Sequence, residues 1–319
     1  MSNNMPLVSI IIPVFNREGL ILETLKSILE QSYQNWECII VDDHSTDGTY
    51  IVISDYIKEE KRFSLVKRPE NKIKGACSCR NYGYKLSNGD YINWFDSDDI
   101  MHQDFLLFKV QKLLSSETID GVVSKTAFFK DDYRELFDKE KRTILTGTLL
   151  EDFIALKVSW YLPDVLWKKT FLIGKDLFDE ELLMGQDRIF HIKMLAGGPN
   201  LVLLDEYLTF YRKHQNSISA TYFSEKYIDK TISHLRASMS LIVFLKKKEL
   251  LSSAVKTVMY KAGIMYLPYT HNNSINKELI KYLTKLFVFN TPTIKNGVKF
   301  YFALLVYKII GKGYAILKL

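Results

Sequence analysis

Short runs of β-branched and aromatic residues alternate with amphipathic stretches over residues 1–100. We expect strands at residues 8–14, 36–41, 63–66 and 91–95, and helices at residues 18–30, 45–58 and 76–87. Strands that alternate with helices of this length are typical of βαβ units. The pattern therefore predicts an α/β fold of Rossmann type, with a mainly parallel sheet flanked by helices on both faces.

The pattern is less regular after residue 100. We expect a helix at residues 101–114, strands at 122–124 and 201–204, and mainly helices over 222–288. The change of pattern near residue 220 predicts an α/β domain at residues 1–220 and a helical, basic C-terminal extension at residues 221–319.

Basic residues are concentrated at one end of the chain. The formal net charge is +6, and residues 279–319 contain seven lysines and no Asp or Glu. Without that +7, residues 1–278 carry about −1, which argues against nucleic acid as a partner. Aromatic and aliphatic residues separate the lysines, as in segments that lie in anionic membrane surfaces. We expect either peripheral contact with the inner face of the cell membrane or a pair of helices packed on the core.

The cysteines and the N-terminus indicate a cytoplasmic protein. An odd count of three cysteines fits a reducing compartment. Cys77 and Cys79 form a single C-x-C pair with no second pair at zinc spacing, so they do not predict a zinc site. No secretory signal is visible, and no stretch reaches the roughly 18–20 apolar residues of a membrane span.

Polar side chains follow three of the expected strands at the points where they end. They are Phe15-Asn16-Arg17, Asp42-Asp43 and Asp96-Ser97-Asp98-Asp99. In parallel sheets, ligands bind beyond the carboxyl ends of the strands. The sequence therefore predicts a polar site at that edge of the sheet.

The run from Asp96 to Asp99 places three carboxylates within four residues. Such a group is costly to bury unless a cation compensates the charge, and Mg²⁺ or Mn²⁺ with oxygen ligands does so. In an extended segment Asp96 and Asp98 project to the same side, while Asp99 is expected to cap the helix at 101–114. For an isolated Asp-x-Asp, a solvated acidic turn is the commoner interpretation.

Several motifs occur together in a specific order. They are Ile12-Pro13-Val14-Phe15-Asn16, Ile40-Val41-Asp42-Asp43-His44-Ser45-Thr46-Asp47-Gly48, Arg80-Asn81, Phe95-Asp96-Ser97-Asp98-Asp99, Gly185-Gln186-Asp187, and Tyr211-Arg212-Lys213-His214. This order resembles that of family-2 inverting glycosyltransferases of the GT-A fold, of the type that builds bacterial cell-envelope polysaccharides. The resemblance covers about residues 7–220.

The resemblance implies a nucleotide-sugar donor, with UDP as the typical nucleotide. Pro13 and Phe15 would border the base, and Asp43 would accept a hydrogen bond from uracil, whose imide N–H needs an acceptor. Arg80 would contact the phosphates, which suits its planar, always charged fork. The other residues implied in donor binding are Asn16, Asp96 and Arg212.

The resemblance also implies a divalent metal and one catalytic carboxylate. Asp98 would coordinate Mn²⁺ or Mg²⁺ with help from Asp96, and His214 would supply a neutral nitrogen. Asp187 would be the general base that takes the proton of an acceptor hydroxyl, on a glycan or a lipid-linked saccharide. Asp187 is also expected at the start of a helix, where a plain N-cap is the alternative.

Two residues depart from the family pattern, and one aromatic residue is a candidate for the acceptor side. His44 stands where the family usually has glycine, and Gln186 stands where it usually has glutamate. Trp160 is either an acceptor-stacking residue or part of the core.

Two other functions compete with the glycosyltransferase. One is an inactive nucleotide-binding protein of the same fold, which the departures at His44 and Gln186 favour. The other is a nucleotidyltransferase, which also uses paired carboxylates and Mg²⁺. That class usually has a glycine-rich phosphate loop after the first strand, where this chain has only Asn16-Arg17-Glu18-Gly19.

Overall fold

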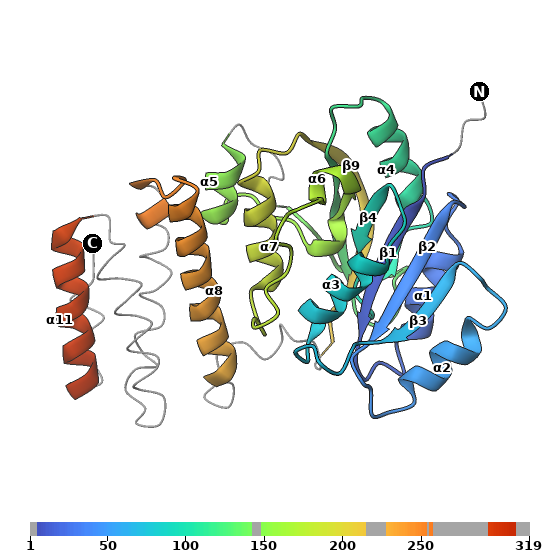
Figure 1. Ribbon diagram of the computed structural model, residues 1–319, viewed down its shortest axis with the longest axis horizontal. Helices are drawn as coiled ribbons and strands as arrows, with labels where there is room; N and C mark the ends of the chain where they lie inside the picture. The colour runs from blue at the N-terminus through green and yellow to red at the C-terminus, as the bar shows by residue number, and fades with distance from the viewer. Residues whose placement is uncertain (1–4, 142–147, 215–227, 254, 258–292, 311–319) are drawn as a thin grey trace. The chain divides into compact units, whose positions relative to one another are not determined.

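The computed structural model describes residues 5–141, 148–214, 228–253, 255–257 and 293–310 (Figure 1). The chain divides into two compact units. Unit 1 comprises Met1–Gly147, Val158–Glu181 and Lys193–Ser217, and unit 2 comprises Thr148–Lys157, Leu182–Ile192 and Ile218–Leu319. The boundary expected at residue 220 stays a prediction.

Unit 1 contains the α/β part of the chain. Its strands are β1 (Val8–Val14), β2 (Trp36–Asp42), β3 (Phe63–Lys67), β4 (Tyr91–Trp94), β5 (Ile100–Met101), β6 (Gly121–Phe129), β7 (Asp138–Lys139), β8 (Val165–Lys168) and β9 (Leu201–Arg212). Its helices are α1 (Ile21–Leu29), α2 (Thr49–Tyr56), α3 (Ala76–Leu86), α4 (Phe105–Leu114), the short 3-10 helix η1 (Leu162–Asp164) and α6 (Lys169–Leu172).

The strands form one sheet in the order β3-β2-β1-β4-β8-β6-β9-β5, with β7 beside β6. The first four strands along the chain pair in parallel, in the order β3-β2-β1-β4. The strand β8 joins β4 antiparallel, and the long pair β6 and β9 is parallel again. The predicted fold class is confirmed. The parallel strands bring the carboxyl ends of β1, β2 and β4 to the same edge of the sheet.

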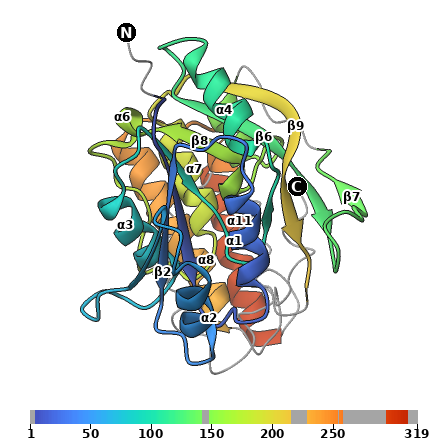
Figure 2. The same cartoon turned by 90° about the vertical axis from the view of Figure 1, so that its right-hand side faces the viewer.

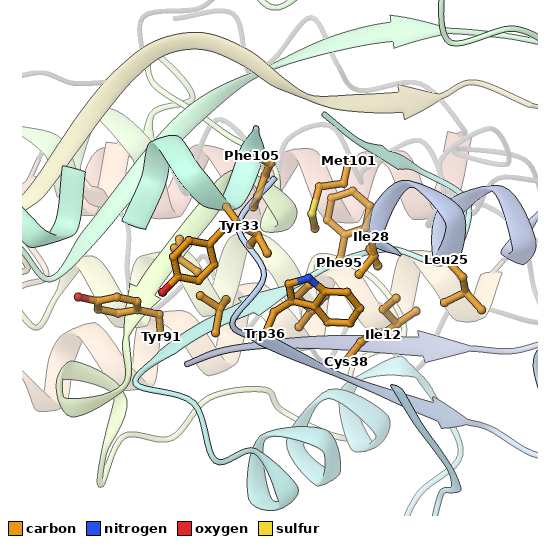
Figure 3. Close-up of a cluster of buried hydrophobic side chains, with 14 of the residues drawn as sticks. Ile12, Leu25, Ile28, Tyr33, Trp36, Cys38, Tyr91, Phe95, Met101 and Phe105 are labelled. Carbon is orange, nitrogen blue, oxygen red and sulfur yellow. The ribbon is translucent and has the colours of Figure 1, made fainter. Parts of the chain in front are cut away.

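Helices cover both faces of the parallel strands, with α1 on one side and α3 on the other (Figure 2), and alternate strand residues pack against each. Ile10 and Ile12 of β1 belong to the main core with α1, α2 and α4, and Figure 3 shows Trp36 and Phe95 in the same cluster. On the opposite face, Ile39 and Val41 of β2 pack with Cys79 of α3. Because strand side chains alternate with a period of two, buried residues on both faces require a sheet covered on both sides.

Unit 2 is helical where it is described. It contains α5 (Leu149–Ile154), most of α7 (Gln186–Leu195), α8 (Ile228–Lys247) and α11 (Ile294–Ile310). The hydroxyl of Ser233 on α8 accepts hydrogen bonds from the amides of Leu183 (2.8 Å) and Met184 (3.0 Å), which ties α8 to the segment before α7. No described helix is both long and apolar enough to cross a membrane.

The helix expected at residues 101–114 begins later than predicted. Ile100 and Met101 form the strand β5, where they pair with Phe210 and Thr209 of β9. The helix α4 therefore begins at Phe105, with Asp104 at its N-cap position. The prediction that Asp99 caps this helix is wrong, because the strand β5 lies between Asp99 and the start of α4.

We predict that Gly83→Ala destabilises unit 1 by about 1–3 kcal/mol in the free energy of unfolding. Gly83 is a buried residue of α3, and a Cβ there would overlap Cγ2 of Ile11 in β1. Gly19→Ala is the matched control, because a Cβ at Gly19 has no atom within 4 Å. Chemical denaturation measures both changes, and an equal effect of the two substitutions would contradict the packing argument.

Candidate active site

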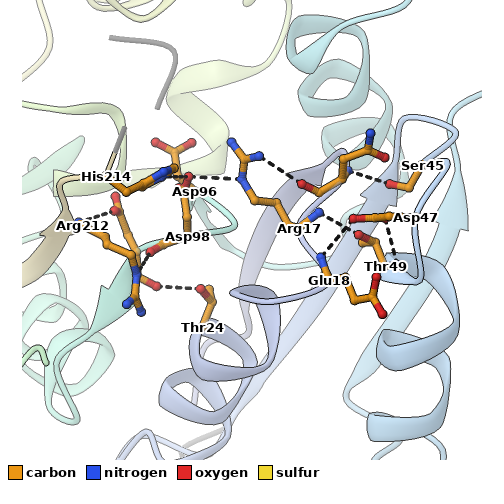
Figure 4. Close-up of polar contacts among 12 residues, drawn as sticks. Arg17, Glu18, Thr24, Ser45, Asp47, Thr49, Asp96, Asp98, Arg212 and His214 are labelled. Atoms are coloured by element: carbon orange, nitrogen blue, oxygen red, sulfur yellow. Dashed lines mark hydrogen bonds and ion pairs between the residues drawn. The ribbon is translucent and has the colours of Figure 1, made fainter. Parts of the chain in front are cut away.

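The carboxyl ends of β1 and β2 are joined by a network centred on Asn16. The backbone amide of Asn16 donates to the Ser45 hydroxyl (3.0 Å), and its side-chain oxygen accepts from the Thr46 amide (2.8 Å). The amide of Arg17 donates to the Thr49 hydroxyl (2.7 Å), which fixes the backbone just beyond β1. Figure 4 shows Ser45, Arg17 and Thr49 of this network beside the acidic run.

His44 has a left-handed backbone conformation, with a φ of 59°. Glycine adopts this region without a steric penalty, which explains why a glycine suits this turn. In this chain the imidazole Nε2 lies 2.8 Å from the carbonyl oxygen of Arg68, a hydrogen bond that glycine lacks. The turn is therefore retained with a histidine in the glycine's place.

Asp43 forms a buried ion pair with Arg68. The Nε of Arg68 donates to Oδ1 of Asp43, and both side chains are 7% exposed. The amide of Asp43 also donates to the carbonyl oxygen of Val14 at the end of β1 (2.8 Å). The Asp43 carboxylate is thus held at the sheet edge in a charge-compensated position.

Arg80 reaches the acidic run from α3. Its Nη2 donates to Oδ1 of Asp96 (2.8 Å), and the guanidinium lies 5.5 Å from the ring centre of Phe178. The Arg80 side chain is 5% exposed while that of Asp96 is 28% exposed. The structure thus brings together two residues that the resemblance implies in donor binding.

Asp98 accepts two charged or polar contacts on a single oxygen (Figure 4). Its Oδ2 accepts a hydrogen bond from Nε of Arg17 at 3.2 Å and lies 3.1 Å from Nε2 of His214. Arg17 follows β1 and His214 follows β9, so Asp98 contacts residues that lie just beyond the carboxyl ends of two strands. The carboxylate of Asp98 thus links Arg17 and His214 within the site.

Asp99 is buried, and its carboxylate contacts the backbone of Arg212. Its Oδ1 accepts from the Arg212 amide (2.9 Å), and its Oδ2 is buried without a hydrogen-bond partner among the described residues. Burial, followed by the nearby Asp98 and Asp96 carboxylates, raises the pKa of Asp99 well above its usual range. The Arg212 guanidinium donates to the carbonyl of Asp98 (3.0 Å) and to Glu23 (2.7 Å).

The remaining donor-side residues predicted from the sequence lie at the end of β1. Pro13 is buried in the strand, and Phe15 beyond it is exposed, with Nζ of Lys74 at 4.2 Å from its ring centre. Trp160 is buried, next to the segment that carries η1.

Two buried residues, Lys109 and Asp164, hold the segment that carries η1 in place. Nζ of Lys109 donates to the carbonyl oxygen of Asp164 (2.7 Å), and the Asp164 carboxylate accepts from the Thr126 hydroxyl (2.7 Å) and the Tyr161 amide (2.8 Å). Burial raises the pKa of Asp164 and lowers that of Lys109. The peptide after Trp160 is thus fixed to α4 and β6.

Asp187 belongs to unit 2, in the first turn of α7, as its predicted place at a helix start requires. Gly185 precedes the helix with a φ of 73°, and Gln186 is its first residue. Asp187 is partly exposed. An acid in this position interacts favourably with the helix dipole.

The residues around Asp98 suit a divalent metal by their chemistry. Asp96, Asp98 and His214 offer two carboxylates and an imidazole, which Mn²⁺ accepts. Among the described residues, no three Asp, Glu, His or Cys side chains form a ready-made metal cluster. Mg²⁺-type sites often take only one or two protein carboxylates and complete their coordination with substrate phosphates. The donor set fits a metal of that kind.

Comparison with known proteins identifies the family. The model of "Glycosyl transferase family 2" matches residues 9–178, which is more than half of this chain. The chain belongs to this family. The family and enzyme class predicted from the sequence are therefore confirmed, and the match runs from β1 through β8 and includes the acidic run.

Relatives of this chain are also named as glycosyltransferases. The chain is 32% identical over 231 residues to the putative teichuronic acid biosynthesis glycosyltransferase TuaG of Bacillus subtilis, covering 69% of this chain and 84% of TuaG. It is 40% identical over 116 residues to an uncharacterized glycosyltransferase of Haemophilus influenzae, covering 36% of this chain. That second match spans about half of the relative, 46% of its length.

Solved structures of glycosyltransferases share the fold. TarS 1–349 of S. aureus, in complex with UDP-GlcNAc, has a TM-score of 0.68 at 16% identity over 98% of this chain and 90% of TarS. The mannosyltransferase PcManGT of Pyrobaculum calidifontis, in complex with GDP-Man and Mn²⁺, has a TM-score of 0.53 at 17% identity, covering 97% of this chain and 89% of that one. These likenesses confirm the GT-A fold.

Two arginines of the site were not predicted as site residues. The sequence indicates Arg17 only as part of a polar strand end, and Arg68 was not singled out. Arg68 directly follows β3, the strand next to β2, so the rule that pointed to Asp43 also pointed to Arg68. Arg17 had a similar signal, since it follows β1 by three residues.

We predict that Arg68→Leu lowers the free energy of unfolding by about 3–5 kcal/mol, because it leaves the Asp43 carboxylate buried without its cation. Arg134→Leu removes an arginine of an exposed pair with Asp132 and should leave stability unchanged within error. Denaturant titration followed by circular dichroism measures both variants. Equal stability of Arg68→Leu and the wild type would show that the ion pair between Arg68 and Asp43 does not stabilise the fold.

Proposed function

We propose that this chain is an inverting glycosyltransferase that moves a sugar from a UDP-sugar to a hydroxyl of a glycan or lipid-linked saccharide. Membership of the family supports the reaction class, and TarS, which shares the fold, is described with UDP-GlcNAc. The family match also favours this function over a nucleotidyltransferase. The proposal depends above all on the contact between Asp98 and His214, which joins residues 116 positions apart beside Arg80 and Asp96.

The nucleotide would lie along the ends of β1 and β2. Arg68 engages Oδ1 of Asp43, so we assign Oδ2 to the imide N–H of uracil. The exposed ring of Phe15, with Pro13 and Asn16 beside it, would border the base. The guanidinium of Arg80, a planar and permanently charged group, would contact the diphosphate.

A divalent metal, Mn²⁺ or Mg²⁺, would be held by Asp98 and His214 with support from Asp96. Such a metal stabilises negative charge on a departing diphosphate. PcManGT, a neighbour in fold, is described with Mn²⁺. Arg212 holds the backbone of Asp98 and the carboxylate of Asp99, so its contribution to donor binding would be to position the acidic run.

Asp187 would act as the general base. In an inverting displacement the acceptor hydroxyl attacks the anomeric carbon opposite the leaving diphosphate, and it loses its proton as it does so. One carboxylate within hydrogen-bond reach is sufficient for this step. Trp160 would shape the acceptor side through the segment that Lys109 and Asp164 hold.

We predict that UDP with Mn²⁺ raises the melting temperature of the wild type by about 5–10 °C at 100 times Kd. Asp98→Asn should abolish this shift, because it removes the carboxylate proposed to bind the metal. Asp132→Asn, on the exposed pair with Arg134, is the control and should retain the shift. Differential scanning fluorimetry measures it, and a wild type that shows no metal-dependent shift with any nucleoside diphosphate rules out the proposal.

We predict that Asp187→Asn keeps the thermal shift with UDP and Mn²⁺ but lowers the transfer rate by about 10²–10⁴. Asp179→Asn, eight residues earlier in the sequence, is a control outside the proposed machinery. The assay follows UDP release from a panel of UDP-sugars with and without acceptor. Full transfer by Asp187→Asn would remove Asp187 as the base, and an inactive wild type across the panel would favour the inactive nucleotide-binding protein.

Residues 279–319 would place the enzyme on an anionic membrane surface. Of this segment the structure describes residues 293–310, and α11 carries five exposed apolar side chains spaced along one helical face: Ile294, Val298, Tyr301, Phe302 and Leu305. Lys295 is exposed and Lys299 partly exposed on the same helix. An apolar face with lysines beside it is the pattern of helices that lie in the interface of anionic bilayers.

We predict that the full chain floats with vesicles that contain about 30% phosphatidylglycerol, since each well-placed lysine contributes about 1 kcal/mol at such a surface. The double variant Val298→Ser/Phe302→Ser should lose most of the bound fraction. The control Ile51→Ser/Leu114→Ser removes two equally exposed apolar residues of unit 1 and should float like the wild type. Failure of the wild type to float would exclude the membrane partner.

A further inference from the structure

Three acids at and beside the acidic run are each paired with an arginine side chain. Asp98 pairs with Arg17 and Asp96 with Arg80. The third pair, between Glu23 and Arg212, lies beside them. These three carboxylates therefore each have a cationic partner within the protein before any metal or nucleotide is added.

Arg17 is the arginine of this group with the least fixed side chain. Its backbone amide is anchored to Thr49, while the guanidinium is held by the Asp98 carboxylate at 3.2 Å and by the carbonyl oxygen of Asn16 at 3.1 Å. The Arg17 side chain is 19% exposed, whereas those of Arg80 and Arg212 are 5% exposed.

The two other arginines have additional contacts that oppose movement. The Arg212 guanidinium binds two acceptors and lies 4.5 Å from the ring centre of Phe129. The Arg80 guanidinium lies 5.5 Å from the ring centre of Phe178. A side chain with an anchored backbone, a long flexible stem and a partly exposed head is the one that can change partners at small cost.

We propose that Arg17 exchanges its partner, leaving the Asp98 carboxylate for the donor diphosphate when the metal binds, and that this exchange couples metal binding to nucleotide binding. The inference rests on the proposed function, because it takes Asp98 as a metal ligand. It adds a residue and a thermodynamic property that the proposed function does not contain.

The coupling follows from the charges. A divalent cation beside Asp98 is repelled by the positive Arg17, which occupies the same carboxylate oxygen, so metal alone binds weakly. A diphosphate alone is repelled by the carboxylates of Asp96 and Asp98. Together the two ligands nearly neutralise each other, and the released Arg17 gains a phosphate partner in place of Asp98. Each ligand therefore strengthens the other, and linkage requires the two effects to be equal.

The test is isothermal titration calorimetry on the full chain with Mn²⁺ and UDP, each alone and each in the presence of the other. In the wild type, saturating UDP should tighten Mn²⁺ binding roughly tenfold or more. Arg17→Met removes the competing charge and keeps the length of the side chain. It should bind Mn²⁺ alone about fivefold more tightly, bind UDP with Mn²⁺ about tenfold more weakly, and lose most of the coupling.

Two further variants complete the test. Arg17→Lys keeps the charge and should retain most of the coupling, and Arg134→Met lowers the net charge equally from an exposed pair and should behave like the wild type. Circular dichroism checks folding, and Arg17→Gln carries the same expectation as Arg17→Met should that variant fail to fold.

The outcomes separate this inference from the proposed function. Wild-type binding of Mn²⁺ with UDP, together with Arg17 variants whose affinities lie within twofold of the wild type, would overturn the exchange and leave the proposed function standing. A wild type that binds no Mn²⁺ in the presence of UDP would overturn both. Tighter Mn²⁺ binding by Arg17→Met with weaker UDP binding would support the exchange.

Discussion

Carboxylates crowd the carboxyl edge of the sheet in unit 1, and the neighbouring side chains are arranged to neutralise them. A charged acid is costly to hold at such an edge, partly shielded from water, unless a cation or hydrogen-bond donors lie close by. Four arginines from different parts of the chain meet this need: Arg68 for Asp43, Arg80 for Asp96, Arg17 for Asp98 and Arg212 for Glu23. Under the proposed exchange, a metal and a diphosphate would replace partners that the protein itself supplies at this edge.

Backbone geometry at the sheet edge matters as much as charge. Asn16 and His44 both have left-handed conformations, with φ values of 50° and 59°. Asn tolerates this region better than most residues, and His44 is held there by its contact with the Arg68 carbonyl. These two turns direct the loops after β1 and β2 toward each other, which is why the Asn16 side chain meets Thr46. The departure of His44 from the family pattern therefore changes the residue and keeps the turn.

Much of this could be predicted from the sequence, and the failures have physical causes. Periodicity located β1 to β4 and the helices between them, because both faces of a parallel sheet are buried and the apolar runs are unmistakable. It placed Asp99 in a helix cap because local pattern does not reveal that Ile100 and Met101 pair with β9, more than a hundred residues later. Strand ends point to Asp43 and Asp98, and the same rule points to Arg68 and Arg17, but which arginine pairs with which acid follows only from the three-dimensional arrangement of the strand ends.

The central claim is that Asp98 and His214 hold a metal that also binds the donor diphosphate. Pulsed electron paramagnetic resonance of Mn²⁺ bound with UDP tests it most directly, because the method detects magnetic nuclei close to the metal. The account predicts coupling to phosphorus from UDP together with coupling to an imidazole nitrogen, and loss of the nitrogen coupling alone in His214→Gln. Phosphorus coupling with no nitrogen coupling in the wild type, or a nitrogen coupling that persists in His214→Gln, would contradict it.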